Sequence, residues 1–184
     1  VILCGTLLLM LPISSKDNQS VSFLTALFTA TSSTCVTGLV VVDTYTQWSI
    51  FGQIILLLLI QIGGLGFITI ICLISVALNK QMGLRTRGLL QESINAMSIG
   101  SVDQLIKRII RGTMLFEGIG AILLSIRFIP QFGWAQGLFY SVFHSVSAFC
   151  NAGFDLMGVQ QAYNSFCNYA TDPLVILTLS ALII

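Results

Sequence analysis

The sequence predicts an all-α membrane protein made of repeated units, in which a helix, a re-entrant short helix with its loop, and a second helix follow one another. Composition is the first observation: 55% of the 184 residues are hydrophobic and 8% are charged, whereas soluble domains carry about 25% charged residues. The second is a repeat at a constant offset of 115 residues, the difference between 153 and 38: Phe28, Ser32, Cys35 and Gly38 recur as Phe143, Ser147, Cys150 and Gly153.

Charge and cysteine content exclude several classes of function. The net charge is +1, without the clustered basic excess that a nucleic-acid interface needs. The five cysteines are odd in number and contain no CxxC pair, so neither a disulfide framework nor a zinc site is indicated. We therefore expect no nucleic-acid partner and no bound cofactor.

Apolar and polar stretches divide the chain into a first unit at residues 1–78, a connector at residues 79–111 and a second unit at residues 112–184. Both ends of the chain interrupt apolar runs, and no charged leader precedes the first of them. We interpret the chain as a fragment of a longer polytopic protein whose opening and closing helices are truncated.

The first unit is expected to open with the last turns of a spanning helix, Val1 to Ile13, before a polar turn. Ser20 is then expected to cap a short helix from Val21 to about Thr34, which cannot cross roughly 30 Å of hydrocarbon. The C-terminal end of such a helix carries a partial negative charge. That charge suits a cation in the following loop.

A long apolar helix is expected from Phe51 to Leu78, with Trp48 before it as an interfacial anchor. The glycines at residues 63–66 indicate tight helix packing, since small residues let membrane helices approach closely. A hinge, or a close approach to an ion path, is the alternative explanation of these glycines.

The connector is the one soluble-looking stretch, and it carries six basic residues: Lys80, Arg85, Arg87, Lys107, Arg108 and Arg111. By the positive-inside rule it is cytoplasmic, which puts both re-entrant loops on the outer side. Apolar residues between positions 89 and 99 suggest an amphipathic helix along the membrane surface.

The second unit is expected to begin with a span from Gly112 to Ile129, closed by Pro130. Trp134 then anchors a second short helix, Ala135 to about Phe149, and Pro173 suits the first turn of a final span. The order of elements in the first unit is thereby repeated.

Glu117 lies inside the first span of the second unit. An ionisable residue in a span is a functional-site hypothesis. Pairing with Arg111, or snorkelling to water near the cytoplasmic end, explains it equally well, so we do not assign Glu117 to the site.

The segment from Thr29 to Thr44 organises the chain, because polar residues interrupt it too often for a bilayer span. We interpret it as re-entrant: a short helix enters the membrane and the chain returns as extended backbone. Irregular backbone survives at membrane depth where it packs in protein or lines a wet cavity, and its carbonyl oxygens can replace the water shell of a cation. Gly38 suits the tightest position because it has no Cβ.

At CVTGLVVVDT (35–44), QIGGLGF (61–67) and SAFCNAGFD (147–155), the chain resembles the Trk, Ktr and HKT superfamily of potassium transporters, most closely its KtrB-type members, some of which are labelled sodium-ATPase subunit J. The resemblance implies four such repeats around one pore, of which this chain supplies two. It implies uptake of K⁺ by a multi-pass plasma-membrane protein, without enzymatic activity. A homodimer and a cytosolic nucleotide-binding regulatory subunit are implied as well.

Carried over by motif, the two loops supply a selectivity filter whose backbone carbonyls bind K⁺ or, as the alternative, Na⁺. The implied ion-binding residues are Val36, Thr37, Gly38, Asn151, Ala152 and Gly153, with Cys35 and Cys150 at the inner edge. Each loop contains one glycine, whereas the TVGYG filter of tetrameric potassium channels contains two. This difference argues against a full row of ion sites.

Asp43 and Asp155 lie just outside the two loops. We hypothesise that their charges raise the cation concentration at the outer mouth. Helix capping or turn chemistry is an equally good explanation.

Two other functions are weighed against a pore. An intramembrane hydrolase would use Cys150 with His144, but six residues apart these fall on different faces of a helix, with no third member in evidence. A structural or sodium-translocating subunit of a rotary ATPase would need a carboxylate in mid-span, for which Glu117 is the candidate.

Overall fold

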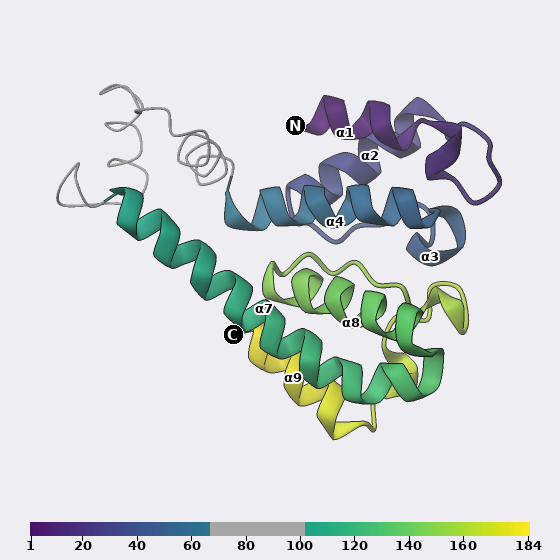
Figure 1. Cartoon of the computed structure of the whole chain (residues 1–184). Coiled ribbons are helices and arrows are strands. Elements are labelled where there is room, and N and C mark those ends of the chain that lie inside the picture. Colours follow the sequence, from purple (N-terminus) through teal and green to yellow (C-terminus); the bar gives the residue numbers. More distant parts are fainter. Residues whose placement is uncertain (67–101) are drawn as a thin grey trace. The chain divides into compact units, whose positions relative to one another are not determined.

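The computed structural model describes residues 1–66 and 102–184, and in these residues it assigns helices and turns but no named strand (Figure 1). An isolated antiparallel bridge joins Ser15 to Trp48. The all-α prediction is therefore confirmed for the described part of the chain. Two compact units are distinguished, Val1–Gly64 with Phe116–Ile184, and Leu65–Leu115.

The first half of the chain contains α1 (Ile2–Leu9), a 3₁₀ turn (Pro12–Ser14), α2 (Phe23–Thr34), α3 (Thr44–Gln47) and α4 (Ile50–Leu65). The predicted end of the short helix at Thr34 is confirmed. The predicted cap is wrong, because the helix begins later than expected and its cap must directly precede it. Ser22, rather than Ser20, accepts a hydrogen bond through its hydroxyl from the backbone N–H of Thr25, at 3.3 Å.

The second half contains α7 (Val102–Phe132), α8 (Trp134–Phe149), 3₁₀ turns at Met157–Val159 and Cys167–Tyr169, and α9 (Pro173–Ile183). The short helix predicted to end at Phe149 does so. Pro173 occupies the first turn of α9, as predicted, and the Asp172 carboxylate accepts the backbone N–H of Leu174 at 3.1 Å.

Pro130 does not end α7, contrary to the prediction that the span closes there. The helix continues to Phe132, and Gly133, with φ +84°, breaks it before α8. A proline removes one intrahelical hydrogen bond and crowds the preceding turn. Close to a helix end, that cost is small enough for two further residues to stay helical.

Trp48 is not an interfacial anchor. Its side chain is fully buried, in an apolar cluster with residues of α1, α2 and α4: Leu9, Ala26, Ala30, Ile55, Leu56 and Leu59. An indole suits either a membrane interface or an apolar core, and the side chain of Trp48 lies in the core. Trp134, predicted to play the same part in the second unit, is 80% exposed, which is compatible with an anchor.

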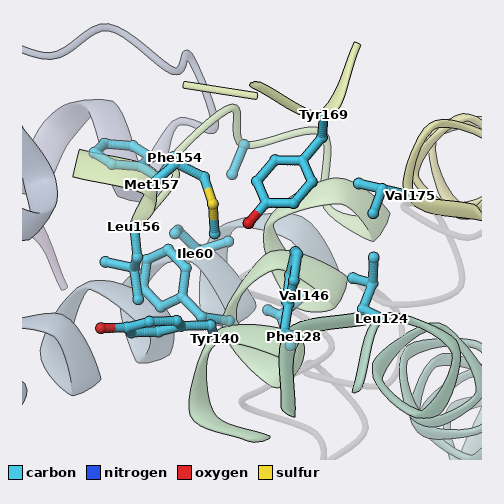
Figure 2. Close-up of a cluster of buried hydrophobic side chains, with 12 residues drawn as sticks. Ile60, Leu124, Phe128, Tyr140, Val146, Phe154, Leu156, Met157, Tyr169 and Val175 are labelled. Atoms are coloured by element: carbon cyan, nitrogen blue, oxygen red, sulfur yellow. The ribbon is translucent and has the colours of Figure 1, made fainter. Parts of the chain in front are cut away.

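A second apolar cluster joins α4, α7, α8, α9 and the chain between the last two helices (Figure 2). It contains Ile60, Leu124, Phe128, Tyr140, Phe143, Val146, Ala152, Phe154, Leu156, Met157, Tyr169 and Val175. Its aromatic rings meet edge to face, as the pair Phe128 and Tyr169 does with centroids 5.5 Å apart. This cluster fixes the loop that follows α8 against the surrounding helices.

Among the described residues, Arg108–Phe132 is the helix long and apolar enough to cross a membrane, and it includes the predicted span from Gly112 to Ile129. The apolar helices Ile50–Leu65 and Pro173–Ile183 are shorter. The remainder of the helix predicted up to Leu78, and most of the predicted connector, lie outside the described residues.

Candidate functional site

The two short helices α2 and α8 end in the same hydrogen-bonded turn. After α2, the N–H of Val36 donates to the carbonyl of Ser33 at 3.4 Å, and the N–H of Thr37 donates to that of Ser32 at 3.0 Å. This is a Schellman arrangement, which satisfies carbonyls at a helix end.

After α8 the same pattern returns 115 residues later, the difference between 151 and 36. The N–H of Asn151 donates to the carbonyl of Ala148 at 2.9 Å, and the N–H of Ala152 donates to that of Ser147 at 2.7 Å. The two loops that the sequence singled out therefore leave their helices by one geometry.

Left-handed backbone recurs at matched positions in the two loops. Val36 and Gly38 have φ of +56° and +73°, and Asn151 and Gly153 have φ of +57° and +70°. The predicted return as plain extended backbone is therefore wrong at these residues. The Schellman turn requires the first left-handed residue, and glycine takes the second at little steric cost.

The two glycines bring the loops together backbone to backbone. A Cβ placed on Gly38 would lie 2.8 Å from the carbonyl oxygen of Ala152 and 3.4 Å from the Cα of Gly153. A Cβ on Gly153 would lie 3.3 Å from the Cα of Gly38. Both glycines are thus held by a contact as well as by a conformation that disfavours side chains.

Consecutive carbonyl oxygens around the glycine of each loop lack protein donors. Among the described residues, no hydrogen bond is accepted by the carbonyl oxygens of Val36, Thr37, Gly38, Asn151, Ala152 or Gly153. These six are the positions nominated from sequence.

The glycines of α4 pack against the ends of both short helices, as predicted. A Cβ on Gly63 would meet the carbonyl oxygen of Thr34, and one on Gly64 would meet Sγ of Cys150. Gly66 is different, since a Cβ there would meet nothing within 4 Å. Close packing therefore explains Gly63 and Gly64, and it places α4 next to the predicted inner edge at Cys150.

Asp43 has a structural task that joins the two halves of the chain. Its carboxylate caps α3 by accepting the N–H of Thr46 at 2.8 Å, and it also accepts the N–H of Tyr163 at 2.9 Å. Gly158 lies against the same carboxylate, because a Cβ there would collide with it. The capping explanation of Asp43 thus has direct support.

Asp155 takes part in a turn of its own. It accepts the N–H of Met157 at 2.9 Å. Burial raises the pKa of this carboxyl, as does the charge of Asp43, while hydrogen bonds from Met157 and Ser165 oppose the rise. Turn chemistry accounts for Asp155, and an effect of its charge on cations stays a prediction.

His144 is engaged on both sides of its ring. Nδ1 lies 2.7 Å from the carbonyl oxygen of Tyr140, and Nε2 accepts the backbone N–H of Leu156 at 2.9 Å. The hydrogen bonds fix a neutral ring with the proton on Nδ1. Neither nitrogen is left to activate Cys150, so the geometry opposes a hydrolase that uses His144 with Cys150.

Glu117 is buried, and its carboxylate accepts a hydrogen bond from the side-chain amide of Gln61 at 2.9 Å. Its backbone carbonyl accepts the hydroxyl of Ser145 at 2.6 Å. The carboxylate therefore ties α7 to α4.

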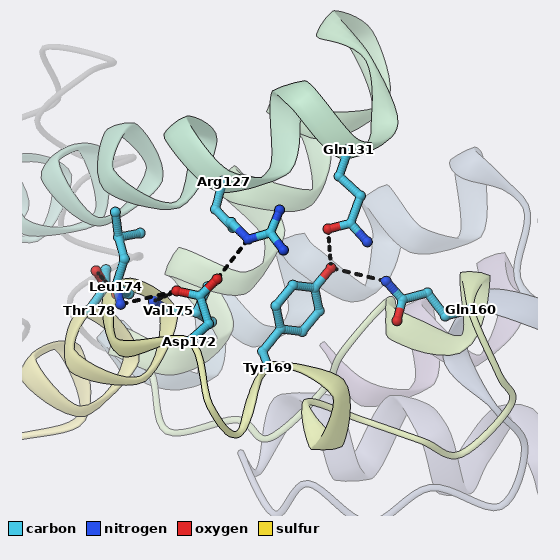
Figure 3. A network of polar contacts seen from close by, with 8 residues as sticks. All are labelled: Arg127, Gln131, Gln160, Tyr169, Asp172, Leu174, Val175 and Thr178. Carbon is cyan, nitrogen blue, oxygen red and sulfur yellow. Dashed lines mark hydrogen bonds and ion pairs between the residues drawn. The ribbon is translucent and has the colours of Figure 1, made fainter.

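A polar network, which no sequence pattern predicted, holds the chain between α8 and α9 (Figure 3). Arg127 donates through Nε to the Asp172 carboxylate at 2.7 Å, and this hydrogen bond lowers the pKa of Asp172. The hydroxyl of Tyr169 donates to Gln131 at 2.8 Å and accepts from Gln160 at 3.1 Å. Partners up to 45 residues apart are invisible to local patterns.

A cavity of about 240 Å³ lies beside the second loop. Its lining includes Ser147, Asn151, Gly153 and Asp155 from the loop region, and Leu179 from α9. Two of the nominated residues, Asn151 and Gly153, thus border open space.

Comparison with known proteins gives a consistent picture. The family model of TrkH, described as "Cation transport protein", matches residues 1–184. Ktr system potassium uptake protein B of Bacillus subtilis (strain 168) is 48% identical over 183 residues, and potassium/sodium uptake protein NtpJ of Enterococcus hirae is 43% identical over 184 residues. Ktr system potassium uptake protein B of Vibrio alginolyticus is 40% identical over 184 residues.

All of this chain takes part in each of these three alignments, against 40%, 40% and 39% of the relatives. The chain therefore spans about two fifths of the length of these curated relatives.

Proposed function

This chain belongs to the TrkH family of cation transport proteins, and we propose that its two loops form part of a pore for K⁺ uptake. The carbonyl oxygens of residues 36–38 and 151–153 would bind the dehydrated ion in place of water. The names of three relatives, which refer to potassium or potassium/sodium uptake, support this assignment.

The observation that carries the proposal is the meeting of two matched loops at Gly38 and Gly153, with carbonyl oxygens that no described protein group occupies. Oxygen ligands without donors suit an alkali cation, which needs several of them and offers no hydrogen bond in return. K⁺ is the transported ion in this proposal, which requires no resident cofactor.

Substitution of the glycines tests the proposal in the full-length protein. Gly38→Ser and Gly153→Asp each put a side chain on a left-handed residue at the loop contact. We expect a loss of rubidium uptake, or a lower ratio of rubidium to sodium uptake, in bacteria that depend on this transporter. Gly133→Ser is the matched control, since Gly133 has φ +84° but open space at its Cβ.

If both glycine variants, at normal protein levels, keep the parental rubidium uptake and the parental ratio of rubidium to sodium uptake, the proposed pore is refuted. If Glu117→Gln abolished flux in the same experiment, a carboxylate-based pump would replace it. The hydrogen bond from Gln61 gives the Glu117 carboxylate a structural role that needs no ion exchange, which favours the pore over the pump.

We extend the proposal to membrane placement and partners. The full-length protein would be a multi-pass plasma-membrane protein with residues 79–111 in the cytoplasm and both loops on the outer side, as the basic residues of the connector indicate. This placement puts the stretch between α8 and α9 outside the cell, so Tyr163→Cys, with the exposed Cys167 replaced by serine, should react with an impermeant maleimide on intact cells. A homodimer and a cytosolic nucleotide-binding subunit are further expectations, to be tested by co-purification.

A further inference from the structure

Ser32 and Ser147 differ from several hydroxyl residues of their helices in the direction of their hydrogen bonds. A serine or threonine inside a helix usually donates to the carbonyl four residues earlier. Thr29, Thr31 and Ser33 do so in α2, and Ser141 does so in α8. Ser32 instead donates forward to the carbonyl of Leu39 at 2.7 Å, and Ser147 donates forward to that of Phe154 at 2.6 Å.

Each of these serines holds its loop at two points. The backbone carbonyl of Ser32 accepts the N–H of Thr37, and its hydroxyl donates to Leu39, so the two bonds bracket Gly38. Both serines are 3% exposed, so water does not compete for these bonds.

The second loop repeats this bracket. The backbone carbonyl of Ser147 accepts the N–H of Ala152, and its hydroxyl donates to Phe154, on the far side of Gly153. One side chain in each loop therefore spans the glycine.

We infer that Ser32 and Ser147 are positioning residues that set the geometry of the ion-binding carbonyls. The inference rests on the proposed pore function, and it attributes the fixed position of the two loops to these two side chains. A carbonyl cage distinguishes ions by its size or by the number of oxygens that it keeps in place, and both depend on where the loop is fixed. Because the hydroxyls occupy the carbonyls of Leu39 and Phe154, the row of free oxygens ends at the glycines.

The two loops are not equally secured. In the first, the Thr37 hydroxyl donates to the hydroxyl of Ser32 at 2.9 Å and lies 3.4 Å from its carbonyl. The corresponding residue of the second loop, Ala152, has no hydroxyl. Loss of the serine hydroxyl should therefore matter more at Ser147, where no neighbouring hydroxyl can take its place.

The test uses the full-length protein and measures uptake of rubidium and of sodium, with the amount of protein in the membrane. We expect Ser147→Ala to lower the ratio of rubidium to sodium uptake about fivefold, the factor that corresponds to one hydrogen bond of about 1 kcal/mol. Ser32→Ala should lower the ratio by a smaller factor. Ser147→Thr, which keeps the hydroxyl, should restore most of it.

Matched controls remove a buried hydroxyl whose bond stays inside its own helix. Ser33→Ala serves for Ser32, and Ser141→Ala serves for Ser147, since both are fully buried and donate four residues back. These controls should keep the parental ratio. If Ser147→Ala does not reach the membrane, Ser147→Cys tests the same point with similar volume and a weaker donor.

Two results are distinguishable. If the Ser32 and Ser147 variants keep the parental ion ratio while Gly38→Ser or Gly153→Asp changes it, the positioning role is refuted and the pore stands. If the glycine variants also transport like the parent, the proposed function itself fails.

Discussion

Asp43→Asn separates the structural task of this carboxylate from an effect of its charge. Asparagine caps a helix about as well as aspartate, so the bond from Thr46 should survive. In the parent, the N–H of Tyr163 donates to the second carboxylate oxygen at 2.9 Å. Asparagine has a single side-chain oxygen, so in the variant its NH₂ group faces the N–H of Tyr163 and this hydrogen bond is lost. A hydrogen bond to a charged group contributes about 1.5 to 3 kcal/mol, so we expect a loss of about 2 kcal/mol.

Two measurements on the full-length protein check this expectation. The unfolding transition in detergent should shift to lower temperature, and amide exchange at Tyr163 should quicken while that at Thr46 does not. Asp17→Asn is the matched control, because Asp17 is exposed and loses the same charge. Unchanged stability and unchanged exchange at Tyr163 would refute the reasoning.

The charge hypothesis for Asp43 has its own outcome in the same variant. If the carboxylate concentrates cations at the outer mouth, the apparent KM for rubidium should rise at low ionic strength and the difference should shrink in salt. A KM that equals that of the parent at low ionic strength would leave capping and loop attachment as the whole role of Asp43.

Three further predictions follow from single contacts. Glu117→Gln should keep rubidium uptake near the parental rate, because its amide oxygen can still accept from Gln61, whereas Glu117→Ala should lower the unfolding temperature. Gly64→Ala should destabilise the protein by about 1 to 3 kcal/mol in denaturant unfolding, since the new methyl collides with Cys150. The pKa of Asp172 is lowered in the folded state, so its carboxylate stabilises the fold at pH values above the usual carboxyl pKa. In unfolding experiments this stabilisation should be lost as the pH falls from the usual carboxyl pKa through the lowered one.

The ends of the short helices could be predicted because local chemistry and the repeat agree there. Thr34 and Phe149 each precede a cysteine, and the spacing from helix to glycine is the same in both loops. Ser22 could not be chosen over Ser20 from sequence, because either hydroxyl can cap and the choice depends on where the first helical bond forms.

Tertiary contacts decided the features that the sequence left open. Trp48 is apolar enough for a core and polar enough for an interface, and its burial depends on α1 and α2 lying against α4. The partners of Glu117 and Asp43 are 56 and 120 residues away along the chain. A pattern read over one helical turn contains no information about either distance.

Val36 shows why the candidate site differs from the rest of the fold. A β-branched residue at φ +56° is a backbone outlier, and such strain costs about 1 to 3 kcal/mol unless the surroundings enforce it. Its counterpart Asn151, at φ +57°, belongs to a residue type that tolerates this region. Glycine or asparagine at position 36 would adopt the same conformation with less strain. The strain at Val36 therefore falls beside the proposed ion-binding carbonyls, in a turn that its own helix enforces.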